Sequence, residues 1–296
     1  MQKGRCALLA LVIALSIVGA ATSASGAGPK GLFKVNGHRL YMSCVGTGKP
    51  VVILDTGLGE DPFTWPSSVL KARVLHTRVC AYDRYGIGRS DGSGRAGSGR
   101  AVKTRTIDQA VNDLHALVLT AKLKGPYVFA GWATGGLIGR EYARRYPKNV
   151  AGMVLFDAAA DDWDTFTGAE TFTSPFEVLN FAAAETALRA HDSIGAKPLV
   201  VVEAGDDSEV RAGYASDKTD AEFQSYWDSS QRSLARISSN SIFVVATKSQ
   251  HDIVSTAPAL SVEAMRIVVN AVRKHAKLPS CAGSTLPKKG GACDAG

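Results

Sequence analysis

One segment of this chain has the pattern of a catalytic turn from which the reactive side chain is missing. Residues 127–137 read Tyr-Val-Phe-Ala-Gly-Trp-Ala-Thr-Gly-Gly-Leu, an apolar strand followed by a glycine-rich turn and the start of a helix. In a Gly-x-Ser-x-Gly turn of this kind, the serine stands at the apex and its oxygen attacks a carbonyl carbon. Gly131 and Gly135 keep the two small positions, but Ala133 occupies the apex. The sequence therefore predicts a nucleophile position without a nucleophile.

Two nearby hydroxyl groups could be mistaken for the missing one. Ser90 lies in a second Gly-x-Ser-x-Gly match at 88–92, but the Gly/Ser-rich residues after it cannot form the helix that such a turn needs. Thr134 lies one residue beyond the apex, and the turn presents only its central side chain to a pocket. We therefore expect Ser90 to stabilise a loop and Thr134 to have no nucleophilic role.

A histidine stands where an acyl-transfer site would need its base. His251 follows an apolar strand at 242–246 after a short loop, and a terminal helix begins soon after it. The chain order of such a site is elbow, acid, histidine, and His251 is in the last of these places. We expect it to face the elbow and to act as general base.

The acid that would orient this histidine can stand after either of two strands. Asp157 directly follows a predicted strand at 152–156. Asp206 and Asp207 follow another at 198–203. Because both strands end at the same edge of a parallel sheet, the sequence leaves the choice open between Asp157 and the Asp206/Asp207 pair.

Backbone N–H groups are the expected partners of a developing negative charge. The segment Thr-Gly-Leu-Gly at 56–59 follows the predicted strand 51–55, which is where the first such donor should lie. We therefore assign the oxyanion position to the N–H groups of Leu58 and Thr134. No Cys/His spacing indicates a metal site, and we expect no cofactor.

Strand and helix patterns alternate along the chain, which is typical of a doubly wound, mostly parallel α/β fold. A Thr-x-x-Gln capping box at Thr106 predicts the start of one helix, and others are expected from Thr134 to about Arg145 and over 258–275. Residues 158–197 hold five aromatic residues and no matching strand, so they are predicted to form a small helical cap. The core would comprise 28–157 and 198–276, followed by a C-terminal tail at 277–296. Strand-like runs occur at 39–45, 51–55, 78–82, 126–130, 152–156, 198–203 and 242–246.

At this level the chain resembles the α/β-hydrolase superfamily over nearly all of residues 32–276. The motifs that carry the resemblance are Thr-Gly-Leu-Gly at 56–59, Cys-Ala-Tyr-Asp-Arg-Tyr-Gly-Ile-Gly-Arg-Ser at 80–90, Gly-Trp-Ala-Thr-Gly-Gly at 131–136 and Ser-Gln-His at 249–251. It is similar to secreted bacterial members, and the resemblance implies cleavage of esters, amides or related bonds by a serine. The chain departs from the pattern at Ala133, at Trp132, where a histidine is common, and at Ser208, where the family often has its acid.

The N-terminus predicts export. Lys3 and Arg5 precede a short apolar run and a series of small residues, the shape of a signal peptide over residues 1–27 with cleavage near Ala24 or Ala27. Contact with a membrane is expected only through this leader. Export permits disulfides, and the pairs Cys44–Cys80 and Cys281–Cys293 are the candidates.

Net charge does not favour nucleic acid as a partner. It is +7 for the whole chain and about +5 without the leader, and no clustered basic face is evident beyond one Gly/Ser-rich loop. That loop holds Arg84, Arg89, Arg95, Arg100, Lys103 and Arg105.

The sequence thus predicts a secreted hydrolase-fold protein that is catalytically impaired or inert and binds a small ligand, either apolar or ester-like. Two alternatives remain open. One is an active hydrolase with an otherwise intact site, and the other is an enzyme that uses only a His–Asp dyad.

Overall fold

The computed structural model of the chain describes residues 28–62, 65–70, 75–93 and 102–293. The predicted leader at 1–27 and two arginines of the basic loop, Arg95 and Arg100, lie outside the described residues. Within the described ranges, no helix is both long enough and apolar enough to cross a bilayer.

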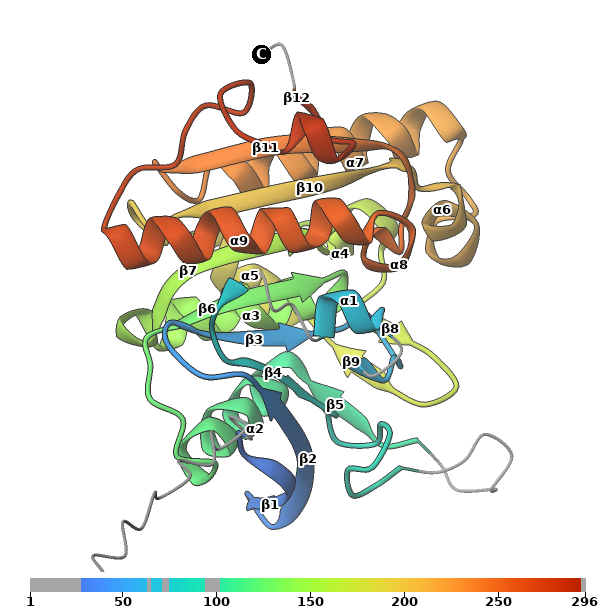
Figure 1. Cartoon of the computed structure of the whole chain (residues 1–296). Coiled ribbons are helices and arrows are strands. Elements are labelled where there is room, and N and C mark those ends of the chain that lie inside the picture. The colour runs from blue at the N-terminus through green and yellow to red at the C-terminus, as the bar shows by residue number, and fades with distance from the viewer. Residues whose placement is uncertain (1–27, 63–64, 71–74, 94–101, 294–296) are drawn as a thin grey trace, which may run out of the picture.

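A large twisted sheet runs through the centre of the molecule (Figure 1). Its described strands lie in the order β1-β2-β4-β3-β6-β7-β10-β11-β12. The neighbours from β4 through β3, β6, β7 and β10 to β11 are parallel, while β1, β2 and β12 join antiparallel at the two edges. The predicted doubly wound, mostly parallel sheet is confirmed. The strands are β1 (Lys30–Val35), β2 (His38–Val45), β3 (Val51–Asp55), β4 (Val79–Tyr82), β6 (Tyr127–Trp132), β7 (Val150–Phe156), β10 (Leu199–Asp206), β11 (Ser241–Gln250) and β12 (Ala292–Cys293).

Helices cover both faces of this sheet. One face carries α1 (Ser67–Leu70), α8 (Ile253–Thr256) and α9 (Pro258–Lys274), and α9 lies across the front in Figure 1. The other face carries α2 (Ile107–Thr120), α3 (Thr134–Arg145), α5 (Ala182–His191) and α7 (Asp220–Ala235). The apolar strands β3 and β6 are buried along their whole length because each lies between two helical layers.

Local sequence signals fix the ends of the central helices. Thr106 and Gln109 form the predicted capping box at the start of α2, each side chain bonded to the backbone of the other residue. The helix after the elbow, α3, has the expected bounds. Strand β11 is longer than predicted, since Thr247 to Gln250 continue the strand instead of forming a loop.

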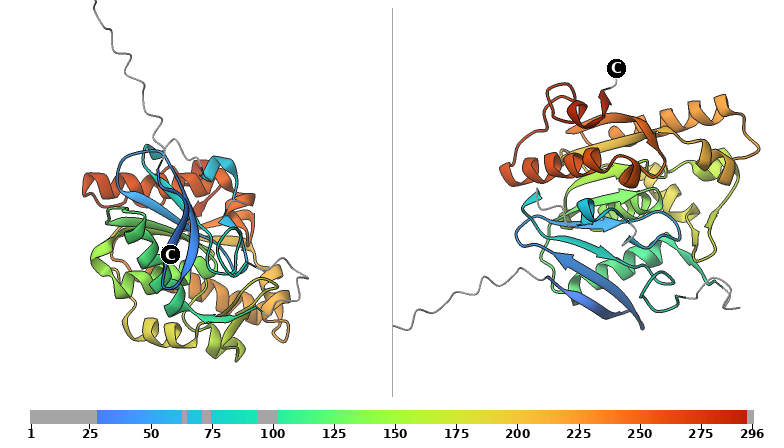
Figure 2. Two further views of the ribbon diagram at one scale, coloured as in Figure 1. Left: turned by 90° about the horizontal axis from the view of Figure 1, so that it is seen from below. Right: turned by 45° about the vertical axis from the view of Figure 1, so that its right-hand side comes forward.

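The insertion at 158–197 is more than a helical cap. It contains α4 (Trp163–Thr167) and α5, but also two strands, β8 (Thr171–Thr173) and β9 (Val178–Asn180). With β5 (Thr104–Thr106) they form a second small sheet in the order β5-β9-β8. The prediction that 158–197 has no strand was wrong, because three-residue strands are too short to show a periodic pattern. Figures 1 and 2 show β8, β9 and α6 (Ser208–Tyr214) at the edge to which the parallel strands point.

The tail at 277–296 is partly built into the core, contrary to the expected free extension. Leu286 is fully buried, and β12 pairs antiparallel with β11 at the sheet edge. The short helix η4 (Pro287–Lys289) precedes β12. A disulfide between Cys281 and Cys293 closes this segment, and a second one joins Cys44 to Cys80 across β2 and β4. Both predicted disulfides are present: one joins the antiparallel neighbours β2 and β4, and the other joins edge strand β12 to the loop that precedes it.

Candidate active site

The turn at Ala133 has the strained backbone of a nucleophile elbow. Strand β6 ends at Trp132, α3 begins at Thr134, and Ala133 between them has φ 49° and ψ −120°. A residue other than glycine adopts such angles at a cost of roughly 1–3 kcal/mol, and only where its surroundings enforce them. The apex side chain at 133 is therefore held in a special position although it carries only a methyl group.

Close packing on both sides explains why the two glycines of the turn are required. A Cβ at Gly131 would lie 2.6 Å from the carbonyl carbon of Gly135, and a Cβ at Gly135 would lie 2.5 Å from the backbone oxygen of Asp55. The backbone of Ala133 is also bonded on both sides, from its N–H to Phe156 and from Ala159 to its carbonyl. The elbow thus persists without its hydroxyl.

His251 lies beside one of the two predicted acids. Its Nδ1 is 2.5 Å from Oδ2 of Asp157, which stands immediately after β7. The other carboxylate oxygen of Asp157 accepts hydrogen bonds from Trp227 Nε1 at 3.0 Å and from the Ala204 N–H at 3.1 Å. Asp157 is fully buried and has three donors, so it has the environment of an ionised carboxylate.

The two residues predicted as the alternative acid, Asp206 and Asp207, lie in different environments. Asp207 is buried, and its Oδ1 lies 3.6 Å from His251 Nδ1, but neither of its oxygens has a hydrogen-bond donor among the described residues. Asp206 is exposed and accepts the N–H of Ser208. The structure therefore brings Asp157 and Asp207 to His251 and leaves Asp206 outside.

Burial and charge set opposite protonation states within this cluster. Burial alone would disfavour the charged imidazolium, but the contacts of the ring with the neighbouring carboxyl groups, first of all the hydrogen bond to Asp157, outweigh burial and raise the pKa of His251 to about 9. Burial, and then the adjacent charge of Asp157, raise the pKa of Asp207 to about 8. The hydrogen bonds and the nearby imidazolium keep the pKa of Asp157 below its usual value despite burial. At neutral pH the cluster holds an imidazolium, a carboxylate and a neutral carboxylic acid.

The neutral state of Asp207 has a measurable consequence for stability. A carboxyl whose pKa is raised on folding destabilises the protein progressively as pH rises from its unfolded value, about 4, to its folded value. Asp207→Asn keeps the shape of the protonated acid and removes this cost. We expect the variant to have a higher Tm than wild type at pH 8 and a much smaller difference near pH 4, as followed by circular dichroism. A constant difference at both pH values would contradict a neutral Asp207.

Three residues of this cluster have donor atoms close enough for a metal ion. Among the described residues, the atoms of Asp157, Asp207 and His251 lie within 4.8 Å of one another. The 2.5 Å contact between Nδ1 and Oδ2 is nevertheless the length of a short hydrogen bond. Two ligands of a tetrahedral zinc would stand roughly 3.3 Å apart at metal–ligand distances of about 2.0 Å. The arrangement fits a hydrogen-bonded dyad better than a metal centre.

Two tryptophans that sequence reasoning did not assign hold the dyad in place. Trp132 Nε1 donates to the backbone oxygen of His251 at 2.8 Å, and Trp227 donates to Asp157. Trp132 is the residue that replaces the common histidine of the family pattern, so that departure was the available signal. Trp227 comes from α7, far along the chain, and no local pattern marks it.

The loop that carries Leu58 is fixed by a buried ion cluster. Arg84, which sequence reasoning placed in a basic loop, is 4% exposed and lies 2.6 Å from Asp55 and 2.7 Å from Glu177. It also donates to the backbone oxygens of Thr56 and Gly57, and Glu177 accepts the N–H of Gly59. The guanidinium thus joins the loop after β3 to the insertion at 158–197.

Removing this guanidinium should destabilise the protein strongly. Arg84→Met would leave the carboxylates of Asp55 and Glu177 buried without their partner, which costs about 3–5 kcal/mol in comparable buried pairs. The control is Arg39→Met, because Arg39 pairs with Asp91 at the surface, where such a pair contributes about 0–1 kcal/mol. Urea denaturation gives both free energies of unfolding. Equal losses would show that the buried cluster adds nothing beyond a surface pair.

The predicted oxyanion donors lie at the same pocket as the elbow and the histidine. Leu58, Ala133, Thr134 and His251 all line it, and among the described residues no acceptor is found for the N–H groups of Leu58 and Thr134. The side-chain oxygen of Thr134 is also buried and unpaired in this part of the chain. These are the amides that sequence reasoning assigned to the oxyanion position.

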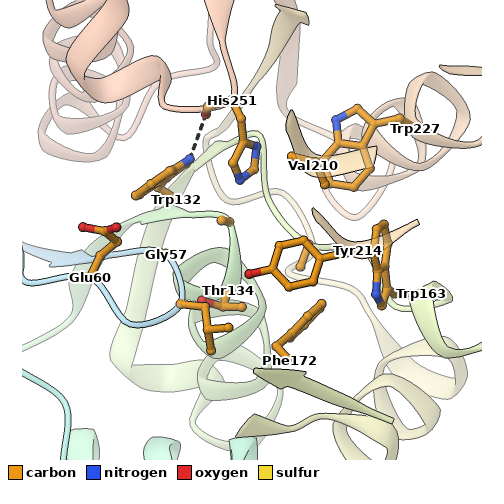
Figure 3. Close-up of a pocket in the computed structure, with 13 residues that line it drawn as sticks. Gly57, Glu60, Trp132, Thr134, Trp163, Phe172, Val210, Tyr214, Trp227 and His251 are labelled. Atoms are coloured by element: carbon orange, nitrogen blue, oxygen red, sulfur yellow. Dashed lines mark hydrogen bonds between the residues drawn. The ribbon is translucent and has the colours of Figure 1, made fainter. Parts of the chain in front are cut away.

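The pocket has a volume of about 190 Å³ and is walled by aromatic side chains (Figure 3). Figure 3 shows the imidazole of His251 pointing into it between Trp132 and Trp227, while Glu60 lies on the side of Trp132 away from Trp227. Part of the cover comes from α6, outside the predicted cap. The aromatic lining comprises Trp132, Trp163, Phe172, Tyr214 and Trp227.

Comparisons with known proteins agree with this fold. The profile of a family described as serine aminopeptidase, S33, a hydrolase family, matches residues 75–220. The uncharacterized protein YqjL of Bacillus subtilis (strain 168) is 26% identical over 219 residues, covering 70% of this chain and 79% of that protein. A putative carbamate hydrolase RutD of Yersinia enterocolitica is 31% identical over 122 residues, 40% of this chain and 41% of that protein.

Solved structures show the same fold. An alpha/beta hydrolase fold protein from Chitinophaga pinensis superposes with a TM-score of 0.58 at 13% identity, covering 83% of this chain and 98% of that one. A putative lipase from Acinetobacter baumannii superposes with a TM-score of 0.57 at 17% identity, covering 85% and 93%. With the sheet order and the family match over residues 75–220, these likenesses show that the chain has the α/β-hydrolase fold and resembles the hydrolases of that family.

Proposed function

We propose that this protein is a hydrolase-fold binding protein that takes up a small apolar or ester-like ligand and does not cleave it through an acyl-enzyme. The observation that carries the proposal is the elbow backbone at Ala133, which keeps φ 49° and ψ −120° while the side chain offers no oxygen. In a serine protease, loss of the nucleophile lowers turnover roughly 10⁶-fold. A comparable loss here leaves ligand binding as the main capacity of the pocket.

The other groups of the site keep their positions, which supports a retained binding function. His251 and Asp157 stay hydrogen-bonded, and the amides of Leu58 and Thr134 stay at the pocket. In this proposal Ala133 marks the nucleophile position, His251 and Asp157 are the base and its orienting acid, and the two amides form the oxyanion hole. Relatives named as a putative lipase and a putative carbamate hydrolase support a small ester-like ligand.

We also propose that the protein acts outside the cytoplasm. The leader-like residues 1–27 and the two disulfides support export, since disulfides persist in oxidising compartments. Mass spectrometry of protein from the culture medium or cell envelope tests this, because a mature N-terminus near residue 25 or 28 is expected.

The inertness of the wild-type protein is tested with two reagents. We expect no covalent labelling by a fluorophosphonate and no hydrolysis of p-nitrophenyl butyrate above the rate of a heat-denatured control. The same ester should still quench tryptophan fluorescence, because three tryptophans line the pocket. Stoichiometric labelling, or turnover that His251→Ala abolishes, would overturn the proposal and favour an active hydrolase.

A second candidate function is proton transfer by the His–Asp dyad alone. The observation that favours it is the retained contact between His251 and Asp157, whose burial costs desolvation energy. With its pKa raised to about 9, His251 would act as a base only at alkaline pH. Solvent deuterium incorporation into phenylacetone that rises toward pH 9 and disappears in His251→Gln would support this candidate.

A further inference from the structure

We propose that the ligand of this pocket is a monocarboxylate with an apolar tail, whose carboxylate binds between His251 and the N-terminus of α3. The inference rests on the proposed function, because the carboxylate would lie where an active hydrolase has its serine oxygen, and Ala133 leaves that position free. It is carried by unpaired donors on residues that line the same pocket.

The first donors come from the backbone. The N–H groups of Leu58 and Thr134 have no acceptor among the described residues, and both residues line the pocket. Thr134 is the first residue of α3, a twelve-residue helix whose N-terminus carries partial positive charge. The hydroxyl of Thr134 is a further polar group that is buried, 4% exposed, and without a partner in the described chain. One carboxylate oxygen can satisfy the two N–H groups, and the hydroxyl is available beside them.

The second donor is the imidazole of His251. Its Nδ1 is bonded to Asp157, so Nε2 is the ring nitrogen left to a ligand, and the ring points into the pocket (Figure 3). In a serine hydrolase the nucleophile's oxygen lies between the base and the substrate carbonyl. Ala133 has no atom there. The second oxygen of a carboxylate can therefore take the position of the absent hydroxyl and accept from Nε2.

Charge distinguishes a carboxylate from the matching ester. The ring's contacts with the neighbouring carboxyl groups, first of all the hydrogen bond to Asp157, outweigh its burial and raise the pKa of His251 to about 9, so the ring is an imidazolium at neutral pH. In the tetrahedral intermediate of a serine hydrolase, the ligand carries a negative charge beside an imidazolium and the amides of the oxyanion hole. The imidazolium and the two unpaired amides of this site would complement the negative charge of a carboxylate in the same way. A neutral ester gains only part of these interactions, and hydrogen bonds to charged groups are the stronger ones.

The rest of the pocket suits an apolar tail and a single acid group. Trp163, Phe172 and Trp227 line the space beyond the donors, and the volume of about 190 Å³ limits the tail to one ring or a short chain. Among the described residues that line this pocket, Glu60 is the acidic one, and it lies beyond Trp132 as seen from Trp227 (Figure 3). Its charge would repel a second acid group, so we expect dicarboxylates to be rejected.

The test compares three ligands of one shape. Phenylacetate, methyl phenylacetate and phenylacetamide are titrated into the full mature chain at pH 7 by isothermal titration calorimetry. We expect phenylacetate to bind roughly tenfold tighter than either neutral compound, the scale of a charge-assisted hydrogen bond. His251→Gln, which keeps a polar side chain but no charge, should remove this preference. His191→Ala, an exposed histidine on α5, is the matched control and should leave it intact.

The pH dependence of binding gives a second measurement that does not depend on a variant. The preference for phenylacetate should be full near pH 7 and fall as pH rises through about 9, when His251 loses its proton. Asp207 and Glu203, whose pKa values are raised to about 8 and about 9, ionise over the same range and add negative charge behind the dyad. Asp157 is ionised throughout, and Glu60 is the remaining acid at the pocket.

The outcomes separate this inference from the proposed function. Equal affinities for the acid, the ester and the amide, without ester hydrolysis, would overturn the carboxylate assignment. The proposed function as a non-hydrolysing binding protein would remain supported. Hydrolysis of methyl phenylacetate by the wild-type protein would overturn the proposed function itself. A preference for the acid that persists in His251→Gln and at pH 10 would place the anion elsewhere and would also refute the assignment.

Discussion

Ala133→Ser should turn this protein into an esterase. The variant adds one oxygen at a position whose backbone already has the elbow angles, beside the amides of Leu58 and Thr134 and at the same pocket as His251. Removing such a nucleophile costs roughly 10⁶ in turnover, so restoring it into an assembled site should raise kcat/KM for p-nitrophenyl butyrate at least ~10³-fold. The measurement is the initial rate of p-nitrophenol release by matched preparations.

The pH profile of this variant is also fixed by the site. His251 must be neutral to accept the serine proton, and its neighbours raise its pKa to about 9. Activity should therefore increase between pH 7 and about 9. The double variant Ala133→Ser/His251→Ala is the control and should return to the wild-type level. If the folded Ala133→Ser protein binds the ester but shows no esterase activity, the site is not assembled for catalysis.

In the Ala133→Ser background, Asp157→Asn should abolish most of the new activity. An asparagine donates a hydrogen bond to Nδ1 and stabilises the wrong tautomer of the histidine, a change that lowers kcat about 10⁴-fold in a serine protease. The substitution is mild for the fold, because Asn tolerates the positive φ of 45° at this position. Its amide oxygen can also still accept the bonds from Trp227 and Ala204.

Asp207→Asn in the same background is the matched comparison. Asp207 lies 3.6 Å from Nδ1 instead of 2.5 Å and already behaves as a neutral acid, so we expect less than about a tenfold loss of kcat/KM, the size of one modest hydrogen-bond change. The reverse order, with Asp207→Asn inactive and Asp157→Asn active, would make Asp207 the orienting acid. The kinetic pair therefore decides a question that the sequence left open.

Features that depend on neighbouring residues were predictable. The capping box at Thr106 and Gln109 set the start of α2, and the apolar runs set the buried strands because each run alone must cover two faces of the sheet. The two glycines around Ala133 marked the elbow, since a side chain at either would collide with backbone. These signals lie within a few residues of one another along the chain.

Several features that join distant segments were not predictable. Asp157 and Asp207 each follow a strand of the same sheet edge, and only the packed strands show that one reaches 2.5 Å from His251 while the other stays at 3.6 Å. Arg84 looked like part of a basic loop, but it is buried because Glu177, 93 residues away, folds over it. Leu286 looked like part of a tail, and only the packed structure shows it fully buried.

By itself, then, the sequence determined the order of the inner strands of the large sheet, the helices that follow Thr106 and Ala133, the elbow, and the fact that its apex is an alanine, because backbone conformation and periodic burial are short-range properties. Only the tertiary structure decided which carboxylate meets the histidine, which arginine is buried, and which side chains wall the pocket. Those outcomes depend on contacts between residues far apart in the chain, and the difference between 2.5 Å and 3.6 Å is enough to decide which group is hydrogen-bonded.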